Sequence, residues 1–175
     1  MASTADNDEG GALRIMRHNF LLPAAFLACL GAAGVPLSSC AKSIETQSAD
    51  PIEQAYQVLG TPYRYGGKSP ATGFDCSGLV THVFEQSLGI ALPHNASAQS
   101  KLGTRVRLTE LEPGDLVFYN TRRRPYSHVG IYVGDDKFIH APKPGSAVRV
   151  ESMKTAYWVK RYNGGRRLQS PGAQP

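Results

Sequence analysis

The sequence predicts a single α+β domain in which N-terminal helices pack on a largely antiparallel sheet. Apolar residues recur at helical spacing as far as about residue 88. From residue 116 onward the chain consists instead of short β-rich runs separated by turn residues. The two patterns do not alternate, as they would in a parallel sheet built from βαβ units. A chain of 175 residues, 41% of them hydrophobic, suits one globular domain with flanking ends, and this composition excludes disorder throughout.

The apolar run at residues 20–35 predicts an export signal. Arg14 and Arg17 precede the run, which contains Pro23 and is shorter than the roughly 20 apolar residues of a membrane span. A basic flank, a short apolar core and small residues are the layout of a secretory signal. The run leads into Leu-Ser-Ser-Cys40, which resembles the lipobox of bacterial lipoproteins. That resemblance implies cleavage before Cys40 and lipid on its thiol; an uncleaved anchor or a buried helix is the alternative.

We therefore expect a signal peptide over residues 1–39 and a lipidated tether over residues 40–51. Met16 is an alternative start, because residues 1–15 are acidic and polar, unlike the beginning of a signal. Residue 41 is Ala, whereas many lipoproteins retained at the inner membrane carry Asp there. In a Gram-negative cell the resemblance thus implies the outer membrane.

The three cysteines differ in their expected fates. Cys29 lies in the signal, Cys40 would carry the lipid, and Cys76 is then the sole thiol of a mature chain of 136 residues. Unpaired thiols are uncommon outside the cytoplasm, so Cys76 is either buried and inert or chemically employed. Removal of residues 1–39 takes away two arginines and three acids, which raises the net charge from +5 to +6. A basic chain favours an anionic partner.

Two helices are expected in the mature chain. The first spans residues 52–59, and residues 63–73 form a Gly-, Ser- and Pro-rich loop. The second spans residues 76–88, with Asp75 as its N-cap and Gly89 at its C-terminal end.

The second half of the chain predicts strands and a hairpin. Gly-Asp-Asp at residues 134–136 is a hairpin signal between two of the strands. Residues 163–175 are mostly Gly, Arg, Ser, Gln and Pro and are expected to form a disordered tail, which leaves a folded domain at residues 52–162. The expected strands cover residues 116–119, 129–133, 137–140 and 148–151.

Cys76 stands where a catalytic thiol would be placed. The positive end of a helix dipole favours the nucleophilic thiolate, although a small residue packing the helix start would also fit. Such a nucleophile needs an imidazole base and a third group that orients the base. His82 lies about 240° around the helix from Cys76, and His94 is expected to be a solvated loop residue.

His128 and His140 begin and end consecutive strands. If residues 134–136 form a three-residue loop, Val133 pairs with Lys137, and the two histidines are diagonal neighbours on one face. A two-residue loop would place them on opposite faces. Zinc binding by two histidines and a cysteine is an alternative, but the paired-ligand spacings of zinc sites are absent.

Five blocks of the chain, in order, resemble the signature of NlpC-type papain-like cysteine peptidases, especially the Spr-type lipoprotein murein endopeptidases. They are Tyr63-Arg-Tyr-Gly-Gly67, Gly73-Phe-Asp-Cys-Ser-Gly-Leu-Val80, Leu111-Glu-Pro-Gly-Asp-Leu-Val-Phe118, His128-Val-Gly-Ile-Tyr-Val-Gly134 and Phe138-Ile-His-Ala141.

The resemblance implies a papain-like fold and a role for six residues. Cys76 would be the nucleophile, His128 the base and His140 the group that orients it. Tyr63 would help to hold the oxyanion, and Asp75 and Ser77 would border the substrate groove. His94 departs from the Arg that family members often carry there.

The implied function is hydrolysis of an amide bond in peptidoglycan stem peptides or their cross-links, with no metal or cofactor. Peptidoglycan is the expected partner, the membrane is reached through lipid on Cys40, and nucleic acid is not expected for an exported lipoprotein. Arg122, Arg123 and Arg124 are either substrate contacts or a solvated loop. An amidase or acyltransferase on the same scaffold and a catalytically silent wall-binding lipoprotein are the alternatives.

Overall fold

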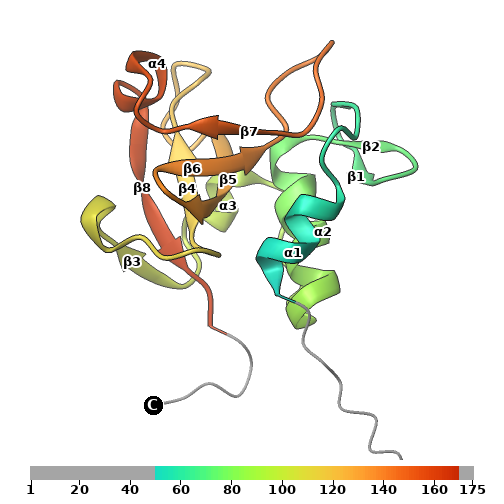
Figure 1. The fold of residues 1–175 in the computed structure, drawn as a ribbon, viewed down its shortest axis with the longest axis horizontal. Helices are drawn as coiled ribbons and strands as arrows, with labels where there is room; N and C mark the ends of the chain where they lie inside the picture. Colours follow the sequence, from blue (N-terminus) through green and yellow to red (C-terminus); the bar gives the residue numbers. More distant parts are fainter. Residues whose placement is uncertain (1–49, 170–175) are drawn as a thin grey trace, which may run out of the picture. The chain divides into compact units, whose positions relative to one another are not determined.

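A computed structural model describes residues 50–169 (Figure 1). The helical elements are α1 (Pro51–Gln57), α2 (Cys76–Leu88), α3 (Ala96–Gln99), the 3-10 turn η1 (Leu108–Glu110) and α4 (Ala156–Val159). The strands are β1 (Lys68–Ser69), β2 (Gly73–Phe74), β3 (Thr104–Val106), β4 (Leu116–Tyr119), β5 (His128–Gly134), β6 (Lys137–His140), β7 (Arg149–Ser152) and β8 (Tyr162–Arg167).

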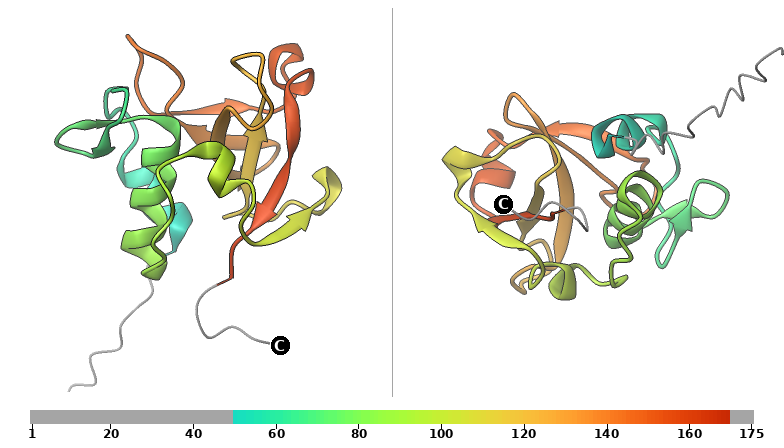
Figure 2. Two further views of the ribbon diagram at one scale, coloured as in Figure 1. Left: turned by 180° about the vertical axis from the view of Figure 1, so that it is seen from behind. Right: turned by 90° about the horizontal axis from the view of Figure 1, so that it is seen from below.

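The described residues confirm the α+β prediction. Strands β3 to β8 form an antiparallel sheet in the order β3-β8-β4-β5-β6-β7, and β1 pairs with β2 in a small separate ribbon. Helices α1 and α2 lie together beside the sheet (Figure 1). Helix α3 contacts both α2 and β5 (Figure 2). No helix in residues 50–169 is long and apolar enough to cross a membrane.

Helix α2 begins and ends where the sequence predicts. The side chain of Asp75 accepts a hydrogen bond from the backbone N–H of Gly78 at 2.7 Å, and Gly89 ends the helix in the left-handed conformation at φ 65°. Helix α1 is shorter than the predicted span at its C-terminal end, and Pro51, assigned to the tether, is its first residue. The preceding tether and the signal lie outside the described residues.

The hairpin between β5 and β6 corrects the predicted loop length but keeps its consequence. Gly134 pairs with Lys137, so the loop has two residues, Asp135 and Asp136, both at positive φ. A bulge at Val133 then shifts the register by one, because Tyr132 pairs with Phe138 and Ile131 with Ile139. A two-residue loop alone would have sent the histidines to opposite faces; the bulge returns them to one face.

Strand β8 overturns the prediction of a disordered tail from residue 163. Its residues pair with β3 on one side and with β4 on the other, inside the sheet. Arg167 donates two hydrogen bonds of 2.8 Å to the buried carboxylate of Asp115, which fixes the end of the strand. A Cβ on Gly165 would lie 2.9 Å from Leu111, so glycine permits close packing there. Backbone pairing and an ion pair, rather than apolar side chains, hold this strand.

Two apolar clusters cover the two faces of the sheet. The larger joins alternate sheet residues such as Phe118 and Ile131 to α1 and α2. The smaller is aromatic and contains Tyr119, Phe138 and Trp158. Because side chains alternate along a strand, the histidines that begin β5 and end β6 face the aromatic cluster.

Candidate active site

Cys76 lies at the first turn of α2, against the beginning of β5. It is a free, partly exposed cysteine, and its sulfur accepts a hydrogen bond from the backbone N–H of Val129. It opens into a cavity of about 260 Å³ that is also lined by Tyr63, Asp75 and Ser77. The fold therefore brings the thiol and three of the other predicted site residues to one cavity.

The two histidines and an acidic residue form a chain of polar contacts on the aromatic face of the sheet. Nε2 of His128 lies 2.8 Å from Nδ1 of His140, and both rings are buried. Nε2 of His140 lies 3.1 Å from a carboxylate oxygen of Glu151, although its N–H points partly away from that oxygen. Because Nε2 of His128 faces His140, Nδ1 is the ring nitrogen of His128 that takes no part in this chain.

Glu151 is held by two further donors. Nε1 of Trp158 donates to the same oxygen that faces His140, at 2.7 Å, and Arg149 donates to the other oxygen at 2.5 Å. Trp158 also stacks on His128, with ring centroids 5.6 Å apart and planes at 21°. Sequence reasoning missed Glu151, because its place beside His140 follows from the β6–β7 pairing and not from any local motif.

The protonation states of the thiol and the imidazole are set mainly by burial. Burial, reinforced by the charge of Asp75, raises the pKa of Cys76 to about 11, and this outweighs the helix dipole expected to favour the thiolate. Burial lowers the pKa of His128 well below 6.5, with smaller contributions from His140 and Arg122. In the free protein the pair is therefore neutral thiol and neutral imidazole.

Further along the polar chain, His140 is neutral and Glu151 is ionised. Burial also lowers the pKa of His140, despite its contact with the carboxylate. The contact with His140, followed by those with Trp158 and Arg149, lowers the pKa of Glu151 to about 2. At neutral pH a carboxylate thus faces a neutral imidazole.

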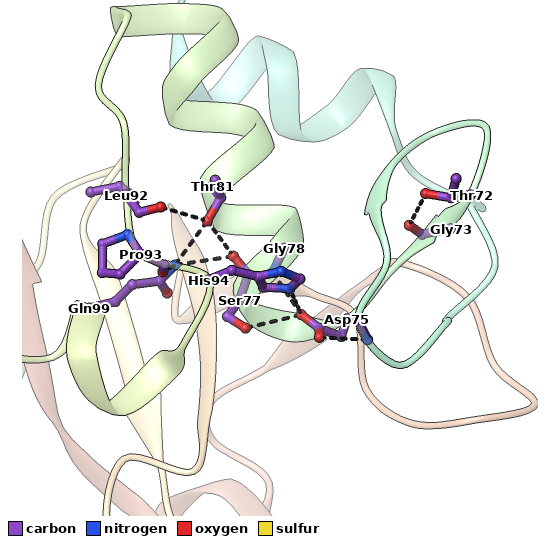
Figure 3. Close-up of polar contacts among 11 residues, drawn as sticks. Thr72, Gly73, Asp75, Ser77, Gly78, Thr81, Leu92, Pro93, His94 and Gln99 are labelled. Carbon is purple, nitrogen blue, oxygen red and sulfur yellow. Dashed lines mark hydrogen bonds and ion pairs between the residues drawn. The ribbon is translucent and has the colours of Figure 1, made fainter.

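Asp75 connects the start of α2 to two loops (Figure 3). One of its oxygens contacts the Gly78 N–H, the Ser77 hydroxyl at 3.0 Å and Nε2 of His94 at 2.8 Å, and the other accepts from the Gly66 N–H at 2.9 Å. Burial alone would raise the pKa of Asp75, but these hydrogen bonds together lower it. His94 is thus part of the site and not the solvated loop residue expected.

The loop that carries His94 is fastened to α2 by a buried glutamine. Nε2 of Gln99 donates to the carbonyl of Ser77 at 3.1 Å and to that of Pro93 at 2.9 Å (Figure 3). A contact between a loop and a helix start explains how His94 can reach Asp75 across 19 residues of sequence. His82, in contrast, packs on the ring of Phe74.

Tyr63 and Arg122 stand side by side at the mouth of the site. The Arg122 guanidinium donates to the Tyr63 hydroxyl, and burial raises the pKa of that hydroxyl, which leaves it a proton donor. Both residues line the Cys76 cavity and also a second cavity of about 620 Å³ beside the histidines. Arg124 lines only the first of these two cavities, so the three arginines of this loop are not equivalent.

The described residues contain no cluster of three or more His, Cys, Asp or Glu side chains able to hold a metal ion. Cys40 lies outside the described residues, so the structure does not bear on its lipidation.

Comparison with known proteins agrees with this architecture. The model of the NlpC/P60 family matches residues 60–167. The chain belongs to this family. The match covers the cysteine, both histidines and β8, and so it includes five residues that the sequence assigned to the tail.

The names of individual relatives describe hydrolytic enzymes. The chain is 41% identical over 123 residues to murein DD-endopeptidase MepH of Escherichia coli, covering 69% of this chain and 45% of that protein. It is 40% identical over 120 residues to gamma-DL-glutamyl hydrolase of Bacillus subtilis, covering 68% and 29%. The chain thus spans less than half of the length of these two relatives.

A solved structure matches the same region. The NlpC/p60 domain of the peptidoglycan hydrolase SagA superposes with a TM-score of 0.60 at 35% identity, covering 69% of this chain and 98% of that one. The match thus covers nearly all of that domain and about two thirds of this chain.

Proposed function

We propose that the protein is a peptidoglycan endopeptidase that uses Cys76 as its nucleophile. The observations that carry this proposal are the polar chain from His128 through His140 to Glu151 and a thiol at a helix start whose sulfur lies against the backbone of Val129, the residue that follows His128. A binding protein has no need of this arrangement, whereas acyl transfer needs a nucleophile, a base and a group that orients the base. The names of the family relatives support the choice of polymer.

Proton positions along the chain follow from the hydrogen bonds. For Nδ1 of His128 to accept the thiol proton, Nε2 must carry the other proton and donate it to Nδ1 of His140. His140 must then carry its own proton on Nε2, facing the carboxylate of Glu151. Glu151 is thus a positioning residue that sets the tautomer of His140 and, through it, that of His128.

The reaction starts from the neutral pair. As the sulfur of Cys76 attacks the amide carbonyl carbon, its proton passes to His128, whose imidazolium is stabilised by the negative charge of Glu151. The hydroxyl of Tyr63, held by Arg122, donates to the developing oxyanion. His128 then protonates the leaving amine and afterwards activates the water that releases the acyl group.

The names of the two relatives imply cleavage of two different bonds. A DD-endopeptidase acts on the bond between D-alanine and diaminopimelate in a cross-link, whereas a glutamyl hydrolase acts on a glutamyl bond. We favour the cross-link, because the resemblance to Spr-type endopeptidases points the same way. Amidase or acyltransferase chemistry would use the same nucleophile, and the products distinguish it.

We also propose that Cys40 carries the lipid and places the domain at the periplasmic face of the outer membrane in a Gram-negative cell. The lipobox-like residues before Cys40 and the Ala that follows it support this. Metabolic labelling with an alkyne-tagged palmitate should mark the wild-type protein and leave Cys40→Ala unlabelled. Equal labelling of both would contradict the anchor.

The test of the activity is digestion of purified sacculi by the chain starting at Ala41, which retains every described element. Mass spectrometry of the released fragments should show cleaved cross-links with the wild type and none with Cys76→Ser. Ser77→Ala is the variant for comparison with Cys76→Ser, because it removes the hydroxyl of the neighbouring residue and keeps the thiol of Cys76. Release of the same fragments by Cys76→Ser would refute the nucleophile, and absence of new fragments with the wild type would refute the activity.

A further inference from the structure

The cavity of about 620 Å³ lies on the imidazole side of the site. Glu151 and Trp158 line it, and these two residues contact His140 and His128 respectively. Tyr63 and Arg122 line both this cavity and the Cys76 cavity, and so they lie at the boundary between the two. The two cavities are therefore neighbouring compartments, one lined by Cys76 and one lined by Glu151 and Trp158, the residues that contact the histidines.

Proton transfer decides which part of a substrate occupies each compartment. The acyl part becomes bonded to the sulfur of Cys76 and belongs in the cavity that Cys76 lines. The leaving amine must receive its proton from His128, so the part attached to that amine extends toward the imidazole side. This reasoning rests on the proposed function and assigns the larger cavity to the amine-bearing part.

The charge of that cavity limits what the amine-bearing part can be. Arg122, Lys143 and Arg149 line it, against the single carboxylate of Glu151. Arg149 is already paired with Glu151. Arg122 and Lys143 have no carboxylate partner among residues 50–169, and both are exposed. Two unpaired cations in a cavity favour an anionic ligand.

We propose that this cavity binds a carboxylate carried by the carbon next to the leaving amine, with Lys143 and Arg122 as its cationic contacts. The D-alanine to diaminopimelate cross-link has this chemistry, because the amine released there belongs to an amino-acid end with a free carboxylate. An amide in place of that carboxylate removes the charge and keeps the size. The cavity thus selects substrates by the free carboxylate beside the scissile bond.

Two matched synthetic peptides test this proposal. In both, a D-alanyl carbonyl acylates the distal amine of diaminopimelate; one has a free carboxylate on the adjoining carbon, and the other has a carboxamide. The wild type should cleave the carboxylate peptide with a kcat/KM about fivefold higher, the size expected of one partly exposed ion pair. Lys143→Gln should reduce this preference, with Arg122 retaining part of it, and should leave kcat/KM for the carboxamide peptide unchanged.

Lys101→Gln, at an exposed lysine that lines neither cavity, is the matched control and should retain the preference. Equal cleavage of the two peptides by the wild type, or an unchanged preference in Lys143→Gln, would overturn the carboxylate subsite and leave the endopeptidase proposal intact. An equal slowing of both peptides by Lys143→Gln would overturn it as well. Cleavage of neither peptide by the wild type would refute the proposed function itself, and the subsite with it.

Discussion

Removal of the carboxylate of Glu151 should slow the reaction although Glu151 neither gives a proton to the substrate nor takes one from it in the proposed mechanism. In Glu151→Leu, Nε2 of His140 loses its only carboxylate neighbour among residues 50–169, so the proton of His140 is free to move to Nδ1. That proton would then point at His128 and drive the proton of His128 onto the nitrogen that must accept from Cys76. The base is lost through a change of tautomer.

The size of this effect follows from the kind of contact removed. A well-aligned hydrogen bond to a charged group contributes about 1.5–3 kcal/mol net, and the imperfectly aligned contact between His140 and Glu151 belongs at the lower end of this range. If all of it supports the productive tautomer, kcat falls about 10- to 100-fold, since each 1.36 kcal/mol is tenfold. Glu151→Gln keeps an acceptor for Trp158 and His140 and loses only the charge, so its loss should lie near tenfold.

The assay combines sacculus digestion rates with ¹⁵N NMR of the histidine side chains, which distinguishes Nδ1–H from Nε2–H. We expect the fraction of His140 carrying Nδ1–H to rise in Glu151→Leu, with Glu53→Gln, an exposed acid on α1, behaving as the wild type. A kcat within about twofold of the wild type in Glu151→Leu would refute the reasoning. A lower kcat with unchanged tautomers would assign Glu151 a structural role instead.

Three other perturbations test the fold around the site. Gly78→Ala places a Cβ 2.0 Å from the backbone oxygen of Gly67 and 2.9 Å from Nε2 of His94, so it should destabilise the fold by about 2 kcal/mol. Thermal melts should show this loss, whereas Gln86→Ala, at an exposed position of the same helix, should change the melting temperature little. Ending the chain after Tyr162 removes most of β8 and should abolish cooperative unfolding in circular dichroism, whereas ending it after Gln169 should not; a cooperative transition in the shorter chain would contradict the role of β8. Because burial lowers the pKa of His128, the unfolded chain binds a proton below about pH 6.5 that the folded chain excludes, so the melting temperature should fall as the pH drops from 8 to 5.5, and His128→Asn should reduce that slope.

Local patterns were sufficient for much of the fold and for the position of Cys76 at the start of α2. Helix α2, its cap at Asp75 and the strands β4 and β6 have strong local signals, because each depends on neighbours within a few residues. Strand β8 has no such signal: glycines and arginines form a strand there because β3 and β4 supply backbone partners from far along the chain.

The same distinction separates the site residues that could be found from those that could not. Cys76 and His128 stand in recognisable motifs, whereas Glu151 acquires its role only when β6 pairs with β7. His94 was misjudged for the same reason, since its partner Asp75 lies 19 residues away and no periodicity connects them. The thiolate expected from the helix dipole also failed, because burial is a property of the assembled cavity.

The bulge at Val133 separates two quantities that hairpins usually tie together. Loop length and side-chain facing are independent here, because the extra residue in β5 compensates for the short loop. What the site requires is the 12-residue interval between the two histidines. A three-residue turn without the bulge would meet that interval equally well, whereas a one-residue shift in the pairing of β5 with β6 would place the imidazoles on opposite faces of the sheet. Relatives are therefore better compared by the face that the two histidines share than by their turns, and a register shift between these strands would mark a chain in which the two imidazoles no longer meet.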